Sequence, residues 1–348
     1  MKHVDVAVVG GGQAGLATAY ALIREGLRPV VLEASERAAG SWPRYYDSLT
    51  VFSPARYCAL PGMPFGGDPH RYPHRDEIVE YLTAYAARLD AEIRTGRRVT
   101  GVREEAGGYV LHTAGGERLA ARAVVAASGT FGRPHRPDLP GFTGTVLHAA
   151  EYREPAPFAG QRVLVVGSGN SAVQIAVELA RGGRVTLASR RPVRFAPQRP
   201  FGRDLHFWLT LTGLDNAPLG RFLRTPPPQP VIDDGRYRVA LASGAPDRRA
   251  MFDRADGRTV TWPDGTREDV DTIVLATGYR PDLPYLDGLG VLDERGCPRH
   301  RDGTPPGHPR LGFVGLEWQR SLSSNALRGV GRDANRLARR LAARLSEG

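Results

Sequence analysis

Two glycine-rich turns hold the residues of this sequence that could bind a nucleotide. The first turn joins the apolar run 4–9 to an apolar, helix-like pattern that continues to Ile23. Its candidate contacts are Gly10, Gly12, Gln13, Ala14 and Gly15. In such a turn the first glycine permits the tight bend, the second lets a pyrophosphate approach the backbone, and the third lets the helix pack on the strand. The helix then presents its N-terminal amides and dipole to the phosphates.

An acidic residue follows at the place where a ribose would lie. Glu33 ends the next apolar run, 30–32, and its carboxylate could accept hydrogen bonds from ribose hydroxyls. The strand, the glycine turn, the helix and this acid together indicate dinucleotide binding much more strongly than the glycines alone.

The second turn repeats the pattern with two differences. Its candidate contacts are Gly167, Gly169, Asn170, Ser171 and Ala172. Alanine replaces the third glycine, and Ser189, Arg190 and Arg191 stand where the first unit has its acid. Guanidinium groups there match a ribose 2′-phosphate, which favours NADP over NAD. The alternative is that these arginines belong to the general arginine surplus of the chain.

Composition excludes several other chemistries. The 348 residues have a formal charge of +10, and Lys2 is the only lysine, so neither a P-loop nor a pyridoxal phosphate site can be built. Cys58 and Cys297 form no C-x-x-C pair, and the histidines show no metal-ligand spacing, so we expect no metal and no disulfide chemistry. The arginines are scattered and no apolar stretch approaches a membrane span, so we expect a cytoplasmic protein that binds neither nucleic acid nor membrane.

The repeated unit also organises the chain. Each copy ends in an apolar run followed by a turn of small residues: Ser128 and Gly129 in the first half, and Thr277, Gly278 and Tyr279 in the second. These patterns predict an α/β protein with two Rossmann-like dinucleotide-binding domains, the second inserted into the first. A flavin paired with a nicotinamide would use two such sites. The pattern 332–345 predicts a closing helix.

Three further motifs are similar to those of a known family. Phe142, Gly144, His148 and Tyr152 have the spacing of F-x-G-x-x-x-H-x-x-x-[YFW]; residues 276–279 read A-T-G-Y; and Gly40, Ser41 and Trp42 match G-G-x-W apart from Ala39. In this combination the sequence resembles the class B flavin monooxygenases, above all the flavin-containing monooxygenases and their plant relatives in the auxin pathway. The resemblance spans nearly the whole chain.

The resemblance implies cofactors and a reaction. FAD would occupy the domain formed by residues 1–153 and 273–348, and NADPH the inserted domain 154–272. Reduced flavin and dioxygen would form a C4a-peroxyflavin that oxygenates sulfur or nitrogen in a small molecule, or attacks the carbonyl of a keto acid. The flavin itself would then be the catalytic group. An NADPH-dependent flavoprotein reductase with a protein or small-molecule acceptor is the main alternative, and a weakly active sensor or scaffold is another. The oligomeric state stays open.

Three side chains are candidates for a direct role beside the flavin. Phe52 stands where the animal-type enzymes have an asparagine, which makes broad amine oxidation less secure. His148 could act as an acid or serve a structural role in the linker between the domains. The resemblance places Asn325 near the isoalloxazine, at the start of the last helix, whose positive end would stabilise the reduced ring. Tyr152 replaces the tryptophan usual in Baeyer–Villiger enzymes, which disfavours ester formation from ketones.

Overall fold

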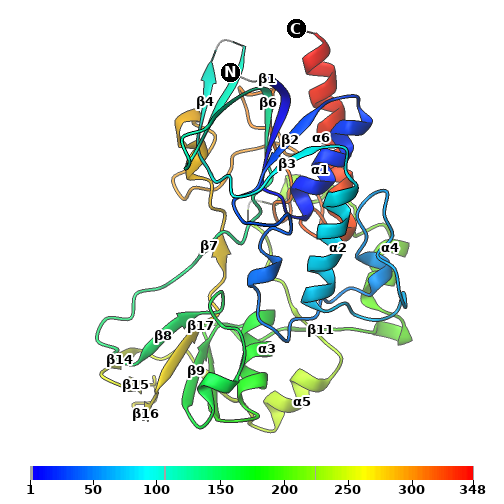
Figure 1. Ribbon diagram of the computed structural model, residues 1–348. Helices are drawn as coiled ribbons and strands as arrows, with labels where there is room; N and C mark the ends of the chain where they lie inside the picture. The colour runs from blue at the N-terminus through cyan, green and yellow to red at the C-terminus, as the bar shows by residue number, and fades with distance from the viewer. Residues whose placement is uncertain (1–2, 106, 224, 348) are drawn as a thin grey trace.

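The computed structural model describes residues 3–105, 107–223 and 225–347. It contains two α/β units, each built on its own sheet and stacked one above the other in Figure 1. None of the helices in the described residues is long and apolar enough to cross a membrane.

The first sheet is mostly parallel and has the order β3-β2-β1-β6-β5-β4, with β19 also paired to β6. Its strands are β1 (His3–Val9), β2 (Pro29–Leu32), β3 (Glu92–Arg94), β4 (Val99–Glu105), β5 (Gly108–Thr113), β6 (Arg118–Ala126) and β19 (Leu311–Phe313). The long strand β6 pairs with β5 through its first half and with β19 through its second half. This arrangement lets a β-hairpin and the C-terminal part of the chain share one edge of the sheet.

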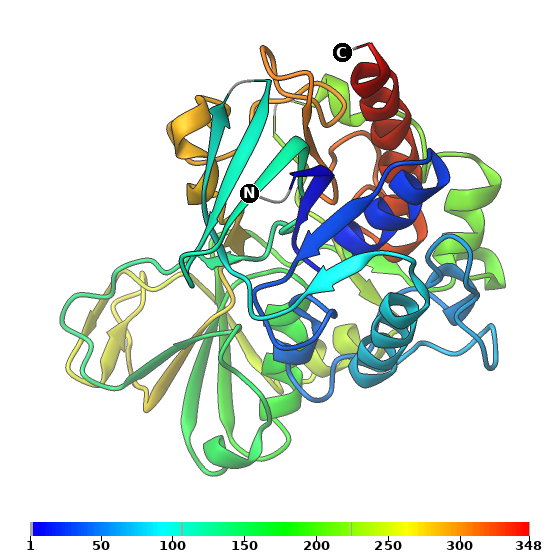
Figure 2. The same ribbon diagram turned by 45° about the horizontal axis from the view of Figure 1, so that its top comes forward.

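Three helices cover one face of this sheet: α1 (Gln13–Arg24), α2 (Arg75–Arg88) and α6 (Leu327–Ser346). Their apolar faces and the sheet form one core that includes Val8, Leu16, Leu82 and Leu337. In Figure 2 α6 lies along α1, although the two helices come from opposite ends of the chain. The last helix begins earlier than the predicted 332–345, because its first turn is glycine-rich and lacks the leucine periodicity.

The second sheet is wholly parallel and has the order β13-β10-β9-β17-β8. Its strands are β8 (Thr145–His148), β9 (Arg162–Val166), β10 (Arg184–Ser189), β13 (Asp247–Ala250) and β17 (Thr272–Leu275). Helices α3 (Asn170–Leu179) and α5 (Arg236–Ala242) pack beside it, and the meander β14 (Arg254–Asp256), β15 (Thr259–Thr261) and β16 (Arg267–Asp269) covers its other side. A hairpin turn around Asp264 and Gly265 joins β15 to β16.

Two strands of this second sheet lie outside the range expected for the inserted domain. Both β8 and most of β17 fall in the segments that the sequence assigned to the first domain, yet β17 pairs with both β8 and β9. The segment with the F-x-G-x-x-x-H-x-x-x-[YFW] motif therefore enters the second sheet before Tyr152. The sequence did not indicate this, because β8 is short and only half apolar and gives no strand pattern by itself. The chain passes between the sheets through β7 (Arg133–Pro134) and β18 (Tyr279–Arg280), which pair with each other.

One segment of the inserted part packs against the first domain. It contains β11 (Phe195–Pro197), α4 (Leu205–Leu211) and β12 (Val231–Asp233). Figures 1 and 2 both place α4 beside the 50–60 segment. The ring centroids of His206 and Tyr57 lie 5.9 Å apart, which confirms this contact.

Candidate active site

A cavity of about 2370 Å³ is lined by residues of both domains. Most of the residues selected from the sequence border it: Gly10, Gly12, Gln13, Ala14, Glu33, Gly40, Ser41, Trp42, Phe52, Ser128, Gly129, His148, Gly169, Asn170, Ser171, Ala172, Gly278, Tyr279 and Asn325. The others lie outside its lining: Gly15, Gly167, Ser189, Arg190, Arg191 and Thr277. The fold thus gathers both glycine turns and the C-terminal segment around one space.

The first glycine turn is fixed by close backbone packing. A Cβ on Gly15 would lie 1.8 Å from the carbonyl oxygen of Gly10, so α1 can approach β1 only without a side chain there. Gly10 has φ +108°, a conformation that L side chains rarely adopt. Gly15 therefore packs the helix against the strand, and its absence from the cavity lining agrees with that use.

Gly12 borders the cavity and touches a second glycine. A Cβ on Gly12 would lie 3.3 Å from the Cα of Gly40, and a Cβ on Gly40 would lie 2.8 Å from the Cα of Gly12. The loop that ends in Trp42 therefore passes directly over the turn. This pair forms a cradle without side chains, which suits the approach of a pyrophosphate to the backbone.

Glu33 has an additional role that the sequence did not indicate. It is buried, and its carboxylate accepts hydrogen bonds from the backbone N–H of Gly11 at 2.6 Å and of Ser35 at 2.7 Å. It therefore joins the glycine turn to the end of β2. Carboxylate oxygens can accept more than one hydrogen bond, so this contact is compatible with a ribose hydroxyl as a further partner.

Gln13 connects three segments that the sequence selected separately. Its side-chain oxygen accepts a hydrogen bond from the indole N–H of Trp42 at 3.0 Å, and its amide donates to the carbonyl oxygen of Asn325 at 2.6 Å. Trp42 is partly buried; it packs against the core of the first domain and also borders the cavity. The start of α1, the G-x-W loop and the approach to α6 are thus held around one side of the cavity.

The second glycine turn differs from the sequence expectation in what its side chains do. The Asn170 side chain bonds to the backbone of the segment before α5, donating to Pro230 O at 3.3 Å and accepting from Ile232 N–H at 3.2 Å. Arg190 and Arg191 are exposed just beyond β10. These arginines could therefore contact only a part of a nucleotide that projects out of the cavity.

His148 is fully engaged by neighbouring backbone. Nδ1 accepts a hydrogen bond from Ala150 N–H at 3.1 Å, which leaves the proton on Nε2, and Nε2 donates to the carbonyl oxygen of Gly278 at 3.1 Å. Burial lowers the pKa of this imidazole, so the ring stays neutral. Its ring also meets Tyr279 edge-on, with centroids 4.9 Å apart. With both nitrogens used, this residue is suited to joining β8 to the A-T-G-Y turn and not to proton transfer.

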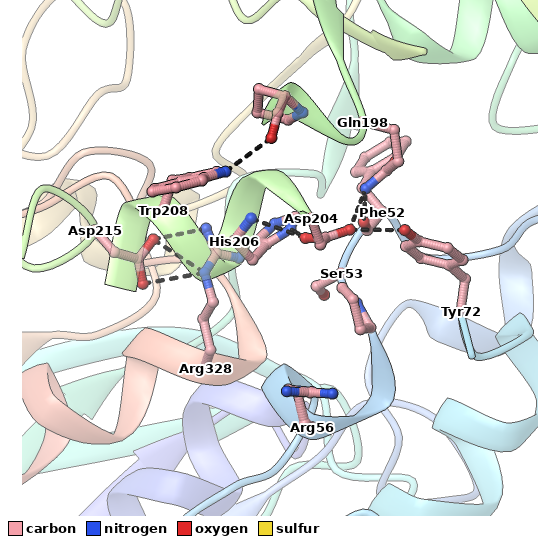
Figure 3. A network of polar contacts seen from close by, with 12 residues as sticks. Phe52, Ser53, Arg56, Tyr72, Gln198, Asp204, His206, Trp208, Asp215 and Arg328 are labelled. Carbon is pink, nitrogen blue, oxygen red and sulfur yellow. Dashed lines mark hydrogen bonds and ion pairs between the residues drawn. The ribbon is translucent and has the colours of Figure 1, made fainter. Parts of the chain in front are cut away.

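A polar network beside Phe52 was not predicted from the sequence. In Figure 3 the Asp204 carboxylate lies among His206, Gln198 and Tyr72. Gln198 donates to Asp204 at 2.7 Å and to the carbonyl oxygen of Phe52 at 3.0 Å. Phe52 and Tyr72 are more than 100 positions from Gln198, Asp204 and His206, and the set forms no motif, so only the fold reveals the network. The cavity is lined by Leu205, His206 and Leu209 of α4, whereas Phe207 and Trp208 of the same helix do not line it.

A buried ion pair fixes the other end of this segment. Arg328, at the start of α6, bonds to the carboxylate of Asp215 through Nε at 3.0 Å and through a terminal nitrogen at 2.9 Å. Ser323 also donates to the carbonyl oxygen of Asp215 at 2.7 Å. The loop after α4 is thereby anchored to the segment that carries Asn325.

The lining has unused hydrogen-bonding capacity that fits a bound cofactor. Thr130 Oγ1, Trp318 Nε1 and Asp302 Oδ1 are buried without a hydrogen-bond partner among the described residues, and all three residues border the cavity. Buried polar atoms normally have partners, so these three atoms could hydrogen-bond to a bound cofactor. Together with the Gly12–Gly40 cradle they fit a dinucleotide of the size of FAD.

Cysteine and metal chemistry find no support in the described residues. Burial raises the pKa of the Cys58 thiol to about 11 and also raises that of Cys297, so neither is an activated thiolate. In the described parts of the chain no group of three or more His, Cys, Asp or Glu side chains could hold a metal ion.

The family follows from sequence comparison. The profile of a family described as "Pyridine nucleotide-disulphide oxidoreductase" matches residues 7–209. An indole-3-pyruvate monooxygenase, YUCCA1 of Oryza sativa subsp. japonica, is 34% identical over 83% of this chain and 80% of its own length. The chain belongs to the class B flavin monooxygenase family.

Two further relatives match this chain almost end to end. An uncharacterized CzcO-like oxidoreductase of Geobacillus kaustophilus is 32% identical over 97% of this chain and 98% of its own. The structure of a flavin-containing monooxygenase from Stenotrophomonas maltophilia has a TM-score of 0.87 and 30% identity, covering 99% of both chains. The predicted fold, with two Rossmann-type dinucleotide domains, is confirmed. The protein is an FAD-dependent oxidoreductase of a family that uses NAD(P)H.

Proposed function

We propose that this protein is an NADPH-dependent FAD monooxygenase that inserts one oxygen atom from dioxygen into a small molecule. The observation that carries the proposal is the single cavity bordered by both glycine turns, Trp42, Phe52 and Asn325. When bound, FAD would supply the redox chemistry, taking a hydride from NADPH and activating dioxygen. Side chains would bind, orient and exclude water.

The residues divide these tasks between them. The Gly12–Gly40 cradle and the N-terminus of α1 would hold the FAD pyrophosphate. Asn325 and Leu327, at the start of the 20-residue helix α6, border the same cavity, so the positive end of the helix dipole would stabilise negative charge on a reduced ring. The apolar wall formed by Phe52, Leu205 and Leu209 would exclude water, which protects a reactive oxygen species from side reactions.

The second nucleotide is proposed to be NADPH. Ser171 and Ala172 at the start of α3 border the cavity, and Arg190 and Arg191 follow β10 in the same domain. Their exposure suits a 2′-phosphate, which would lie at the outer end of the nucleotide.

The reaction and the name of one relative support the proposed substrate class. The rice relative is named for indole-3-pyruvate, a keto acid. Flavin oxygenation also takes soft sulfur and nitrogen nucleophiles, so the proposed substrates are small molecules of these kinds.

The deciding experiment follows both atoms of dioxygen. The FAD-loaded protein is given NADPH, ¹⁸O₂ and a panel of thioethers, amines and keto acids, and the product is analysed by mass spectrometry. One labelled oxygen atom per product and one NADPH consumed would support the monooxygenase. Rapid NADPH-dependent reduction of an artificial electron acceptor, without label in any product, would overturn it in favour of a flavoprotein reductase.

A further inference from the structure

Asp204 and His206 form a hydrogen-bonded pair at the wall of the cavity. Asp204 Oδ1 accepts hydrogen bonds from the backbone N–H of His206 at 2.8 Å and from its ring Nδ1 at 2.9 Å. His206 is 4% exposed and borders the cavity. No function so far described uses this pair.

The surroundings fix Asp204 as a charged acceptor. Its other oxygen, Oδ2, accepts from the Tyr72 hydroxyl at 2.7 Å and from the Gln198 amide at 2.7 Å. Burial disfavours the charged carboxylate, but the hydrogen bonds from His206, Tyr72 and Gln198 outweigh it and lower the pKa of Asp204. An ionised carboxylate can only accept, so the Nδ1 of His206 must carry a proton.

The tautomer determines what the other ring nitrogen offers. With the proton on Nδ1, the Nε2 of a neutral imidazole has a free lone pair. None of the hydrogen bonds among the described residues involves Nε2. This atom is also not among the fully buried polar atoms that lack a partner, so it is accessible. Because the residue lines the cavity, Nε2 is available to a ligand there.

The charged groups nearest this pair are already engaged or exposed to solvent. Arg328 is neutralised by its two hydrogen bonds to Asp215, and Arg199, which hydrogen-bonds Tyr72, is exposed to solvent. The Asp204 carboxylate contacts the Nδ1 side of the ring, so Nε2, on the other side of the ring, is the nitrogen left for a ligand. Leu205 and Leu209 are the other two α4 residues that line the cavity, and both are apolar. Of these three residues, only His206 can accept a proton.

We propose that His206, oriented by Asp204, is the proton acceptor of the active site and takes a proton from a substrate amine. The inference rests on the proposed oxygenation and deepens it by naming the substrate group. An alkylammonium ion gives one proton to Nε2, which yields the neutral amine and an imidazolium paired with Asp204. The amine keeps the electron pair of the broken N–H bond, and that lone pair is the nucleophile that oxygenation requires. His206 is thus a catalytic residue, and Asp204 is a positioning residue.

Binding tests the assignment without turnover. The FAD-loaded, oxidised protein is titrated with 3-phenylpropylamine and with its N,N,N-trimethyl analogue, which has the same charge but no N–H. We expect the wild type to bind the amine about 10-fold more tightly, the worth of one charge-assisted hydrogen bond. His206→Phe keeps a ring against Tyr57 and should bind the two probes equally. Equal binding by the wild type, or tighter binding of 3-phenylpropanoate, would overturn the proposal.

Variants separate this role from folding. Thr210→Ala, exposed on the same helix, should keep the wild-type preference. Asp204→Asn should reduce the preference and His206→Gln should retain part of it, since an amide oxygen still accepts. If His206→Phe loses FAD or stability, His206→Gln carries the comparison: a preference undiminished in both His206→Gln and Asp204→Asn would overturn the assignment.

Turnover distinguishes this inference from the proposed function. For His206→Phe we expect kcat/KM for 3-phenylpropylamine to fall at least about 100-fold, the lower end of the effect of a positioned base, while kcat/KM for methyl 3-phenylpropyl sulfide changes little because the sulfide has no proton to lose. Equal losses with both substrates, or oxygenation of the sulfide alone by the wild type, would overturn the base but leave the monooxygenase intact. An amine preference in binding with no oxygenation at all would overturn the proposed function and leave the pair supported.

Discussion

The side-chain amide of Gln13 donates a hydrogen bond to the carbonyl oxygen of Asn325 at 2.6 Å, joining residues that are 312 positions apart. One belongs to the first glycine turn and the other precedes the last helix. The same glutamine accepts from Trp42, so a single side chain fixes the relative positions of three walls of the proposed flavin site.

Replacement of Gln13 by leucine should therefore weaken both stability and FAD retention. It leaves a partly buried carbonyl and an indole N–H without partners, which costs roughly 1–3 kcal/mol. Thermal unfolding and the FAD content after gel filtration measure the two effects. Trp42→Phe, which removes only the indole donor, should lose less than Gln13→Leu. A Gln13→Leu protein as stable and as yellow as the wild type would contradict this interpretation.

Two glycines of the same turn should behave differently when replaced. Gly15→Ala places a methyl group 1.8 Å from Gly10 O, so the protein should be destabilised by several kcal/mol or fail to fold. Gly12→Val should fold, because the backbone at Gly12 has φ −82° and the Cα of Gly40, 3.3 Å from the new Cβ, need move by only a few tenths of an ångström, but the side chain would fill the pyrophosphate cradle. Circular dichroism and flavin absorbance separate the outcomes. A fully yellow Gly12→Val protein would show that the pyrophosphate lies elsewhere.

The sequence predicted the fold well because the fold depends on local, repeated patterns. Apolar runs, glycine turns and helix periodicity identified both nucleotide units and the closing helix. The strand β8 was assigned to the wrong side of the boundary, since four residues with two exposed side chains show no alternation. Pairing with β17 creates that strand, and pairing is a property of the folded chain.

The candidate site was predicted only where one segment contains the whole motif. Gly12 and Gly40 were both selected, yet their mutual contact required the folded loop. Asp204 and His206 were not selected, because a histidine two residues from an aspartate is common and becomes meaningful only beside Tyr72 and Gln198. His148, a candidate acid, has both ring nitrogens occupied by backbone that no motif specifies.

Acid sensitivity should depend in part on Asp271, at the start of β17. Its carboxylate accepts hydrogen bonds from the side chain and the backbone N–H of Arg162, which lower the pKa to about 2 from 3.8. Above pH 3.8 the ionised group stabilises the folded chain; as the pH falls from 3.8 to about 2, unfolded chains bind a proton that the folded chain resists, and this stabilisation is lost.

Asp271→Asn should thus be less stable than the wild type at neutral pH and should lose less additional stability across that acid range. Urea unfolding at a series of pH values measures both quantities. Asp287→Asn is the matched control, because this exposed carboxylate makes no hydrogen bond or ion pair among the described residues. Parallel pH profiles for wild type and Asp271→Asn would show that the pair with Arg162 contributes nothing.

Coenzyme preference tests the two exposed arginines after β10. Arg190 and Arg191 do not line the cavity, so they are not expected to contact the nicotinamide or the pyrophosphate. If they bind the 2′-phosphate, the double replacement by alanine should raise the KM for NADPH about 10- to 100-fold, the worth of one or two charge-assisted hydrogen bonds, and should leave the KM for NADH nearly unchanged. Because the flavin and the hydride donor keep their positions, kcat should change little with either coenzyme.

Arg184→Ala, at the opposite end of β10, controls for the loss of positive charge and should affect neither KM value. An equal rise for both coenzymes would place the 2′-phosphate away from this strand end, and the preference for NADP would then need another source.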